Sequence, residues 1–144
     1  IVGRLIGAQR RTIIMGSDKM ARAVHIHMKK DLSEVYQVIG FLDSDQELIG
    51  TKIQDIEVYN GNGYLADTLD HHHIDEVIVA SNTIPYQDIL HLISACTRLG
   101  IGLKLVSDEK QDDNQLKTFS LVEVGQDPFA SIKRIIRRGL PRSR

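Results

Sequence analysis

Short apolar runs recur along this sequence at intervals that suit the strands of one sheet. Four of them read RTIIMG (residues 11–16), YQVIGFLD (36–43), IDEVIVAS (74–81) and IGLKLVS (101–107). Short, nearly continuous apolar runs of this kind favour buried parallel strands. A fifth, shorter strand is predicted within DIEVYNGNG (55–63), where a glycine turn ends it.

Segments with helical spacing lie between these runs. Residues 17–30 and 86–100 repeat apolar side chains at helical intervals, and residues 63–73 can form a short helix. In the first segment the apolar face carries Met20, Ala23, Val24, His27 and Met28. Strand and helix therefore alternate, which predicts an α/β fold: a doubly wound, mostly parallel sheet with helices on both faces, in three layers.

The chain changes character outside this alternating region. Residues 1–11 are a basic lead suited to a membrane-proximal position, and residues 12–108 hold the predicted Rossmann-like domain. Residues 109–144 hold a linker strand, predicted in KTFSLVEV (117–124), and then a basic amphipathic helix over residues 127–139. The apolar stripe of that helix can pack on the core or lie on a membrane.

Charge is concentrated at the two ends of the chain. Residues 1–11 and 133–144 together carry nine basic residues and no acidic one, and the other nine basic residues lie among all 19 acidic residues. Basic ends on an acidic body predict attachment to an anionic membrane surface, a neighbouring domain or nucleic acid. The alternative interpretation is that these terminal charges are only solvated.

Composition restricts the class of protein. The chain has 144 residues, 42% hydrophobic and 26% charged, which suits one soluble globular domain. Its one cysteine, Cys96, excludes an internal disulfide framework and fits a reducing compartment. The chain begins at Ile1 rather than at a methionine, so we expect it to be a piece of a longer protein.

The turn after the first strand partly matches a dinucleotide-binding motif. That motif reads G-x-G-x-x-G/A, and its glycines let the backbone approach a pyrophosphate. Here the turn reads Gly16-Ser17-Asp18-Lys19-Met20-Ala21, so Asp18 replaces the middle glycine. Ser17 or Asp18 can cap the helix, whose N-terminus attracts anions, and Lys19 can offset negative charge.

Polar residues also end two other predicted strands at the same edge of the sheet. Asp43 ends the second strand, where an acidic residue typically holds a ribose hydroxyl. Ser81 and Asn82 follow the fourth strand and offer hydrogen-bond donors. We therefore predict a nucleotide site made of Gly16, Ser17, Asp18, Lys19, Met20, Asp43, Ser81 and Asn82. The alternative is that Asp43 and Ser81 only form turns.

Other sites of chemistry are not predicted. His71, His72 and His73 are consecutive, so they cannot all point the same way, and we interpret them as a polar turn that ends a helix. None of the four tyrosines is followed four residues later by lysine, so the pair typical of short-chain dehydrogenases is missing. We predict no metal site and no catalytic residue in this chain.

Four segments, taken in order, resemble a known family. RTIIMGSDKMARAVHIHMKK, YQVIGFLDSDQELIGTKIQDIEVY, HHHIDEVIVASN and LISACTRLGIGLKLVSD look like the CoA-binding-like Rossmann domain of bacterial polysaccharide biosynthesis proteins. The resemblance covers roughly residues 10–108. In that family the domain is found in polyprenyl-phosphate sugar-1-phosphate transferases and in membrane-anchored nucleotide-sugar dehydratases and epimerases.

The resemblance implies a function for the chain. It implies an accessory or regulatory domain on the cytoplasmic side of a membrane, within an enzyme of the sugar transferase type. Its ligand would be a nucleotide or nucleotide-sugar, with NAD, CoA and a UDP-sugar as candidates. A homo-oligomer is possible, and we expect no nucleic-acid partner. Two alternatives stay open: a ligand-free oligomerisation or interaction module, and a fragment of an NAD-dependent nucleotide-sugar dehydratase or epimerase.

Overall fold

The computed structural model describes residues 8–81, 83–107 and 120–123 of the chain. Its helices and strands are, in chain order, β1 (Arg10–Met15), α2 (Lys19–Asp31), β2 (Tyr36–Asp43), β3 (Lys52–Ile53), β4 (Ile56–Asn60), α3 (Leu65–His71), β5 (Glu76–Val79), α4 (Tyr86–Leu99), β6 (Gly102–Ser107) and β7 (Ser120–Glu123). The predicted basic lead, up to residue 7, and the predicted C-terminal helix lie outside the described residues.

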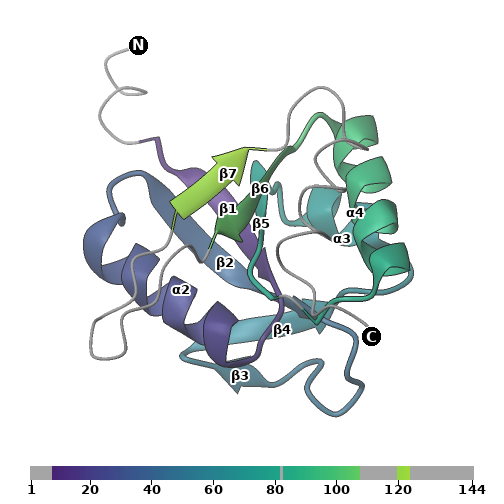
Figure 1. Cartoon of the computed structure of the whole chain (residues 1–144), viewed down its shortest axis with the longest axis horizontal. Helices are drawn as coiled ribbons and strands as arrows, with labels where there is room; N and C mark the ends of the chain where they lie inside the picture. Colours follow the sequence, from purple (N-terminus) through teal and green to yellow (C-terminus); the bar gives the residue numbers. More distant parts are fainter. Residues whose placement is uncertain (1–7, 82, 108–119, 124–144) are drawn as a thin grey trace, which may run out of the picture.

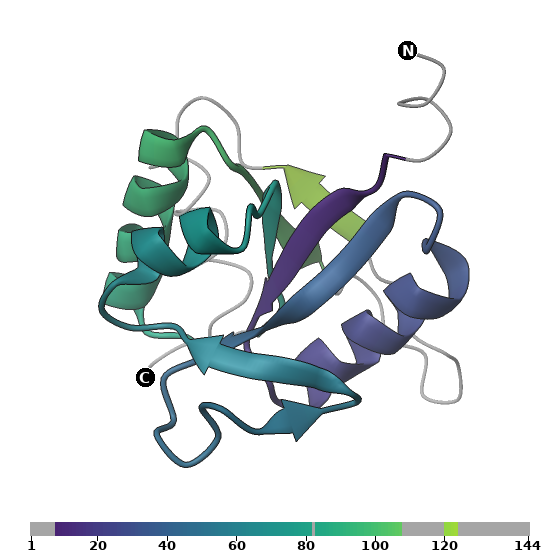
Figure 2. The same ribbon diagram turned by 180° about the vertical axis from the view of Figure 1, so that it is seen from behind.

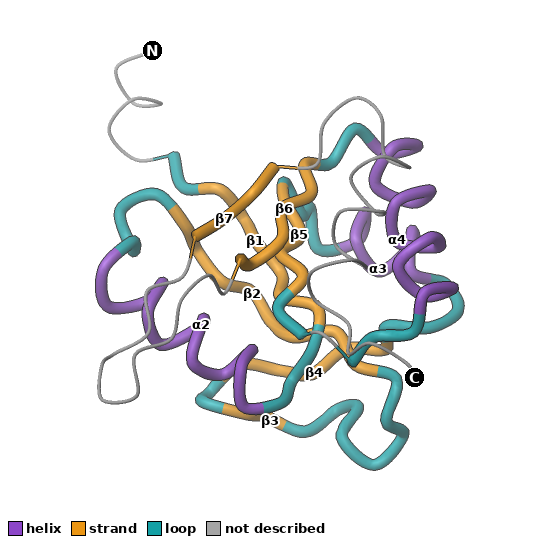
Figure 3. The backbone as a smooth tube through the Cα atoms, in the orientation of Figure 1, coloured by secondary structure: helices purple, strands orange, loops and turns teal. Residues whose placement is uncertain are grey.

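One seven-stranded sheet organises the molecule, in the order β3-β4-β2-β1-β5-β6-β7 (Figures 1 and 3). The five central strands are parallel to one another, and β3 and β7 pair antiparallel to their neighbours at the two edges. The predicted last strand is therefore present as β7 in the same sheet. This arrangement confirms the predicted doubly wound α/β fold.

Helices cover both faces of the sheet. Helix α2 lies on one face, and α3 and α4 lie together on the other (Figures 1 and 2). Each face has its own core: Ile14 and Phe41 pack with Val24 of α2, whereas Ile13 and Leu42 pack with Leu69 of α3 and Leu92 of α4. Successive strand residues thus enter opposite cores, which explains why the strands are apolar on both faces.

The helix ends follow the predicted signals, but one helix face differs. Asp18 is the N-cap of α2, and Gly100 ends α4 in the left-handed conformation at φ +69°. The buried face of α2 carries Ala21, Val24, His25 and Met28. His25 is thus the fully buried histidine, although the prediction did not include it, and His27 of the predicted face is half-buried at the edge of the core. The helix is rotated toward Ala21 relative to the predicted face.

The connection between β2 and β4 also departs from strict alternation. It has no helix in the structure and instead forms the short hairpin of β3 and β4. The hairpin turns at Gln54 and Asp55, both with positive φ, and the Gln54 Oε1 atom lies 2.7 Å from the Nδ1 atom of buried His25. A strand of two residues has no periodicity, so the sequence pattern could not predict β3.

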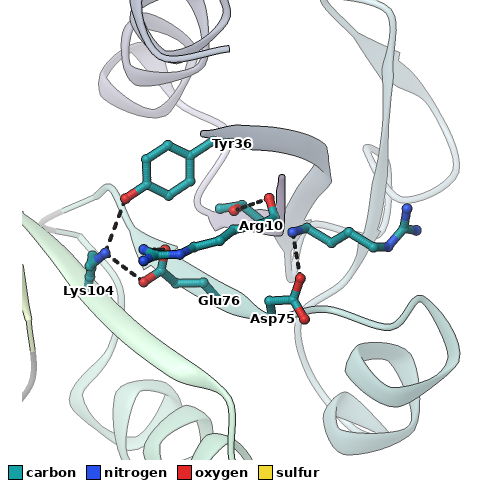
Figure 4. A network of polar contacts seen from close by, with 7 residues as sticks. Arg10, Tyr36, Asp75, Glu76 and Lys104 are labelled. Atoms are coloured by element: carbon teal, nitrogen blue, oxygen red, sulfur yellow. Dashed lines mark hydrogen bonds and ion pairs between the residues drawn. The ribbon is translucent and has the colours of Figure 1, made fainter. Parts of the chain in front are cut away.

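A buried polar network crosses the sheet near the amino ends of the parallel strands (Figure 4). The Lys104 ammonium donates to Glu76 Oε2 at 2.8 Å and to the Tyr36 hydroxyl at 3.1 Å. Arg10 Nη1 lies 3.6 Å from Glu76 Oε1, which accepts no hydrogen bond within the described part of the chain. A carboxylate therefore occupies a buried strand position that the apolar pattern of the segment would assign to a hydrophobic residue.

Candidate functional site

The candidate site lies at the carboxyl edge of the sheet, beside β1. From β1 the chain proceeds outward through β2 and β4, and then returns to the other side of β1 with β5 and β6. The strand order therefore reverses between β1 and β5. In open α/β sheets, ligands bind outside the carboxyl ends of the strands at this type of position.

Gly16 fixes the path of the chain as it leaves β1. Its φ is +113°, which side chains other than glycine rarely adopt, and its N–H donates to the Leu42 carbonyl at 2.8 Å. A Cβ atom at this position would lie 2.9 Å from the Ser81 Cβ atom. The fold itself thus requires glycine here, so a Gly16 variant would test stability together with binding.

Asp43 and Ser17 join the ends of β2 and β1. The Ser17 hydroxyl donates to Asp43 Oδ2, and the Asp45 N–H donates to Asp43 Oδ1 at 2.9 Å. Ser17 is buried, and Arg22 Nε donates to its carbonyl oxygen at 2.9 Å. The Asp43 carboxylate is thus held in a fixed position next to the turn that precedes α2.

Asp18 is held on the opposite side of the same turn. Its Oδ1 accepts from the Ala21 N–H at 3.2 Å as the helix cap, and its Oδ2 accepts from the Ser81 hydroxyl at 3.1 Å. Because Ser81 follows β5 and Asp43 ends β2, the two carboxylates lie on opposite sides of β1. The start of α2 lies between them.

The first turn of α2 offers donors for an anion. Within the described part of the chain, no group accepts a hydrogen bond from the backbone N–H of residues 17–20. Such N–H groups and the helix dipole together attract phosphate. The Lys19 side chain is exposed and Met20 is half-buried, and neither makes a polar contact with another described residue.

Most of the predicted site residues are therefore neighbours in the structure. Hydrogen bonds or close packing link Gly16, Ser17, Asp18, Asp43 and Ser81. Lys19 and Met20 begin the helix beside them, and Asn82 lies outside the described residues. Whether these residues contact a ligand stays a prediction.

Sequence reasoning missed the loop after β4. The Gly61 N–H donates to the Asp43 carbonyl at 2.8 Å, and a Cβ atom on Gly61 would lie 3.2 Å from the Asp43 nitrogen. The pattern Asn60-Gly61-Asn62-Gly63 signals a turn, but only the pairing of β4 with β2 places this turn against Asp43.

The three consecutive histidines, His71 to His73, lie at the end of α3 and not in the candidate site. His72 is the C-cap of α3, as the predicted polar turn requires, and its ring packs on Tyr59 with centroids 4.4 Å apart. Burial, followed by repulsion from His71, lowers the pKa of His72, and burial raises the pKa of Tyr59.

The described residues contain no group of three or more side chains arranged to hold a metal ion. They also contain no helix long and apolar enough to cross a bilayer.

Solved structures with a similar fold include two kinds of protein. UDP-D-quinovosamine 4-dehydrogenase from Vibrio fischeri matches with a TM-score of 0.65 at 20% identity, over 84% of this chain and 98% of that chain. RSP in complex with β-NAD+ and operator DNA matches with a TM-score of 0.55 at 25% identity, over 74% of this chain and 48% of that one. A second structure of RSP, a Rex-family repressor, matches with a TM-score of 0.59 at 22% identity, over 90% of this chain and 60% of that chain.

No protein-family model matches the sequence, and no curated protein matches it significantly. The predicted membership of the polysaccharide-biosynthesis family is therefore confirmed only at the level of the fold. The sheet order, the helices on both faces and the similar structures together establish that this chain has a Rossmann-like α/β fold.

Proposed function

We propose that this chain is a nucleotide-binding domain that takes NAD or a UDP-sugar at the carboxyl edge of its sheet. One observation carries the proposal: the Asp43 carboxylate ends β2 and is fixed by the Ser17 hydroxyl beside the open N–H groups of the β1–α2 turn. A carboxylate in this place can accept hydrogen bonds from ribose, and the N–H groups can bind phosphate. The names of the similar structures, one for a UDP-sugar enzyme and one for an NAD complex, support the same classes of ligand.

The parent protein is the second part of the proposal. The sequence resembles domains of polysaccharide biosynthesis enzymes, and its two basic ends suit a position next to an anionic membrane surface. We therefore assign the chain to an accessory domain on the cytoplasmic side of the membrane. The sugar chemistry would take place on an attached domain of the transferase type.

Calorimetric titration of the 144-residue chain tests the ligand proposal. NAD, NADH, CoA, UDP and UDP-N-acetylglucosamine are titrated into the wild type, Asp43→Ala and Asp70→Ala. Asp70 is an exposed acidic residue of α3 and serves as the matched control. We expect saturable binding of one ligand, lost in Asp43→Ala and kept in Asp70→Ala. Absence of binding to the folded wild type, or equal binding by both variants, would contradict the proposal.

A ligand-free interaction module is the second candidate. The observation that favours it is that all four carboxylate oxygens of Asp18 and Asp43 already accept a hydrogen bond from the protein. This candidate predicts no heat of binding with any ligand of the series. It also predicts a mass above that of the 16.2 kDa chain in light scattering coupled to size exclusion.

A further inference from the structure

Tyr64 exposes an aromatic ring in an unusual place. It is 83% exposed, more than any other large hydrophobic residue in the described part of the chain. Its backbone lies in the left-handed region, at φ +47° and ψ +26°, directly before α3. Glycine and asparagine adopt this conformation at low cost, whereas a residue with a bulky side chain is strained there.

The backbone of Tyr64 is fixed although its side chain is exposed. Its carbonyl oxygen accepts from the Thr68 N–H at 3.0 Å and from the Thr68 hydroxyl at 3.2 Å. The turn before it is ordered by the Asn60 side chain, which accepts from the Asn62 N–H at 2.9 Å. Strained residues held in this way are concentrated at ligand-binding sites, so an outlier of this kind motivates a functional hypothesis.

The turn that carries Tyr64 rests on the proposed ribose-binding residue. Asn60 at the end of β4 is paired in register with Asp43 at the end of β2. Gly61 packs against the Asp43 main chain, where a Cβ atom would make tight contacts of 3.2–3.4 Å. Tyr64 follows three residues later at the same edge of the sheet. The carboxyl edge therefore presents, in order, the N–H groups after β1, the carboxylate of β2 and the aromatic ring after β4.

This order matches the order of groups in a nucleotide, which runs from phosphate to ribose to base. We propose that Tyr64 is the platform on which the base of the bound nucleotide stacks. The inference rests on the proposed function and adds to it the orientation of the bound nucleotide and a residue that contacts the base. It accounts for a strained and exposed tyrosine at a position where glycine or asparagine would serve the fold better.

Three variants of Tyr64 separate stacking from folding. Base–aromatic stacking contributes about 1–3 kcal/mol per base, so Tyr64→Ala should weaken binding roughly five- to 150-fold. Tyr64→Phe keeps the ring and should bind within about threefold of the wild type by the same reasoning. Tyr64→Asn relieves the left-handed strain, so it should raise or preserve the unfolding temperature while it weakens binding as much as alanine does.

The experiment titrates ADP, UDP and NAD into the full chain and the three variants by calorimetry, with Tyr86→Ala as the matched control. Tyr86 is also exposed, at 44%, but follows β5 on the other side of β1. Weaker binding in Tyr64→Ala and Tyr64→Asn, with rescue by Tyr64→Phe and no loss of ADP or UDP binding in Tyr86→Ala, is the expected result. Nucleotide binding that is equal in the wild type and Tyr64→Ala would overturn the stacking inference alone. A wild type that binds none of the three nucleotides would overturn the proposed function, and the inference with it.

Discussion

Removal of Lys104 should destabilise the fold far more than removal of an exposed lysine. The Glu76 carboxylate is only 6% exposed and its Oε2 accepts from Lys104 at 2.8 Å. Loss of one partner from a buried ion pair costs about 3–5 kcal/mol, because the remaining charge is buried without compensation. Arg10 lies 3.6 Å from the other oxygen but is half-exposed, so it compensates only in part. We therefore expect Lys104→Met to lose about 3 kcal/mol, at the lower end of that range.

Urea denaturation followed by circular dichroism gives the free energy of unfolding at pH 7. Lys52→Met is the control, since Lys52 is exposed on β3, and we expect it to change stability by less than about 0.5 kcal/mol. The double variant Glu76→Leu/Lys104→Met removes both charges and should recover most of the loss. A loss below about 1 kcal/mol for Lys104→Met, or a double variant less stable than Lys104→Met, would refute the reasoning.

The ion pair of Lys104 with Glu76 also determines how the free energy of unfolding changes at alkaline pH. Burial alone lowers the pKa of Lys104, but the hydrogen bonds to Glu76 and Tyr36 and the charge of Glu76 outweigh it, so the pKa is raised. A raised lysine pKa stabilises the fold below the unfolded value of about 10.4, and this contribution is lost as pH rises through the folded value. The stability difference between wild type and Lys104→Met should thus be constant from about pH 7 to 9 and narrow only above pH 10.

Three other predictions concern the site and two titrating side chains. Asp18→Asn keeps the helix cap but removes a negative charge, so nucleotide binding should tighten by about three- to 100-fold, the range for charges ~6 Å apart between the dielectric constants of bulk water and of a protein surface; calorimetry that shows no change would contradict it. Burial raises the pKa of Cys96 to about 12, so iodoacetamide at pH 8 should label the thiol only in urea, as mass spectrometry can check. The lowered pKa of His72 means that its stabilising contribution is present above pH 6.5 and is lost below it. Between pH 7 and 5, the unfolding free energy should therefore fall less in His72→Gln than in the wild type.

The fold was predictable because its strands and helices follow simple periodic patterns. Continuous apolar runs gave the parallel strands, since each strand such as β1 faces a core on both sides. The exact face of α2 was not predictable, because His25 and His27 are equally polar and only the packing against Phe41 and Gln54 favours burial of His25. Glu76 was missed for a similar reason: its partner Lys104 is distant in sequence and adjacent only in the folded sheet.

The candidate site was predictable in its residues but not in its contacts. The position of Asp43 at a strand end and of Gly16 before a helix follows from the sequence pattern, and parallel pairing brings both to one edge. The hydrogen bond from Ser17 to Asp43 depends on side-chain geometry, which the pattern does not contain. The packing of Gly61 against Asp43 depends on the register of β2 with β4. Tyr64 was not predicted because neither exposure nor a left-handed backbone is visible in sequence.

The hydrogen bonds already made by Asp43 are compatible with a bound ribose. Each carboxylate oxygen has two lone pairs, and in the structure Oδ2 accepts one bond from Ser17 and Oδ1 one from the Asp45 N–H. One lone pair on each oxygen therefore remains, which is the number that two adjacent hydroxyl groups need. The protein contacts fix the direction of the carboxylate before any ligand binds, so little side-chain entropy is lost on binding. On the proposed function, these contacts preorganise the ribose acceptor, and a 2′-phosphate in place of a hydroxyl would meet the Asp43 charge and bind more weakly.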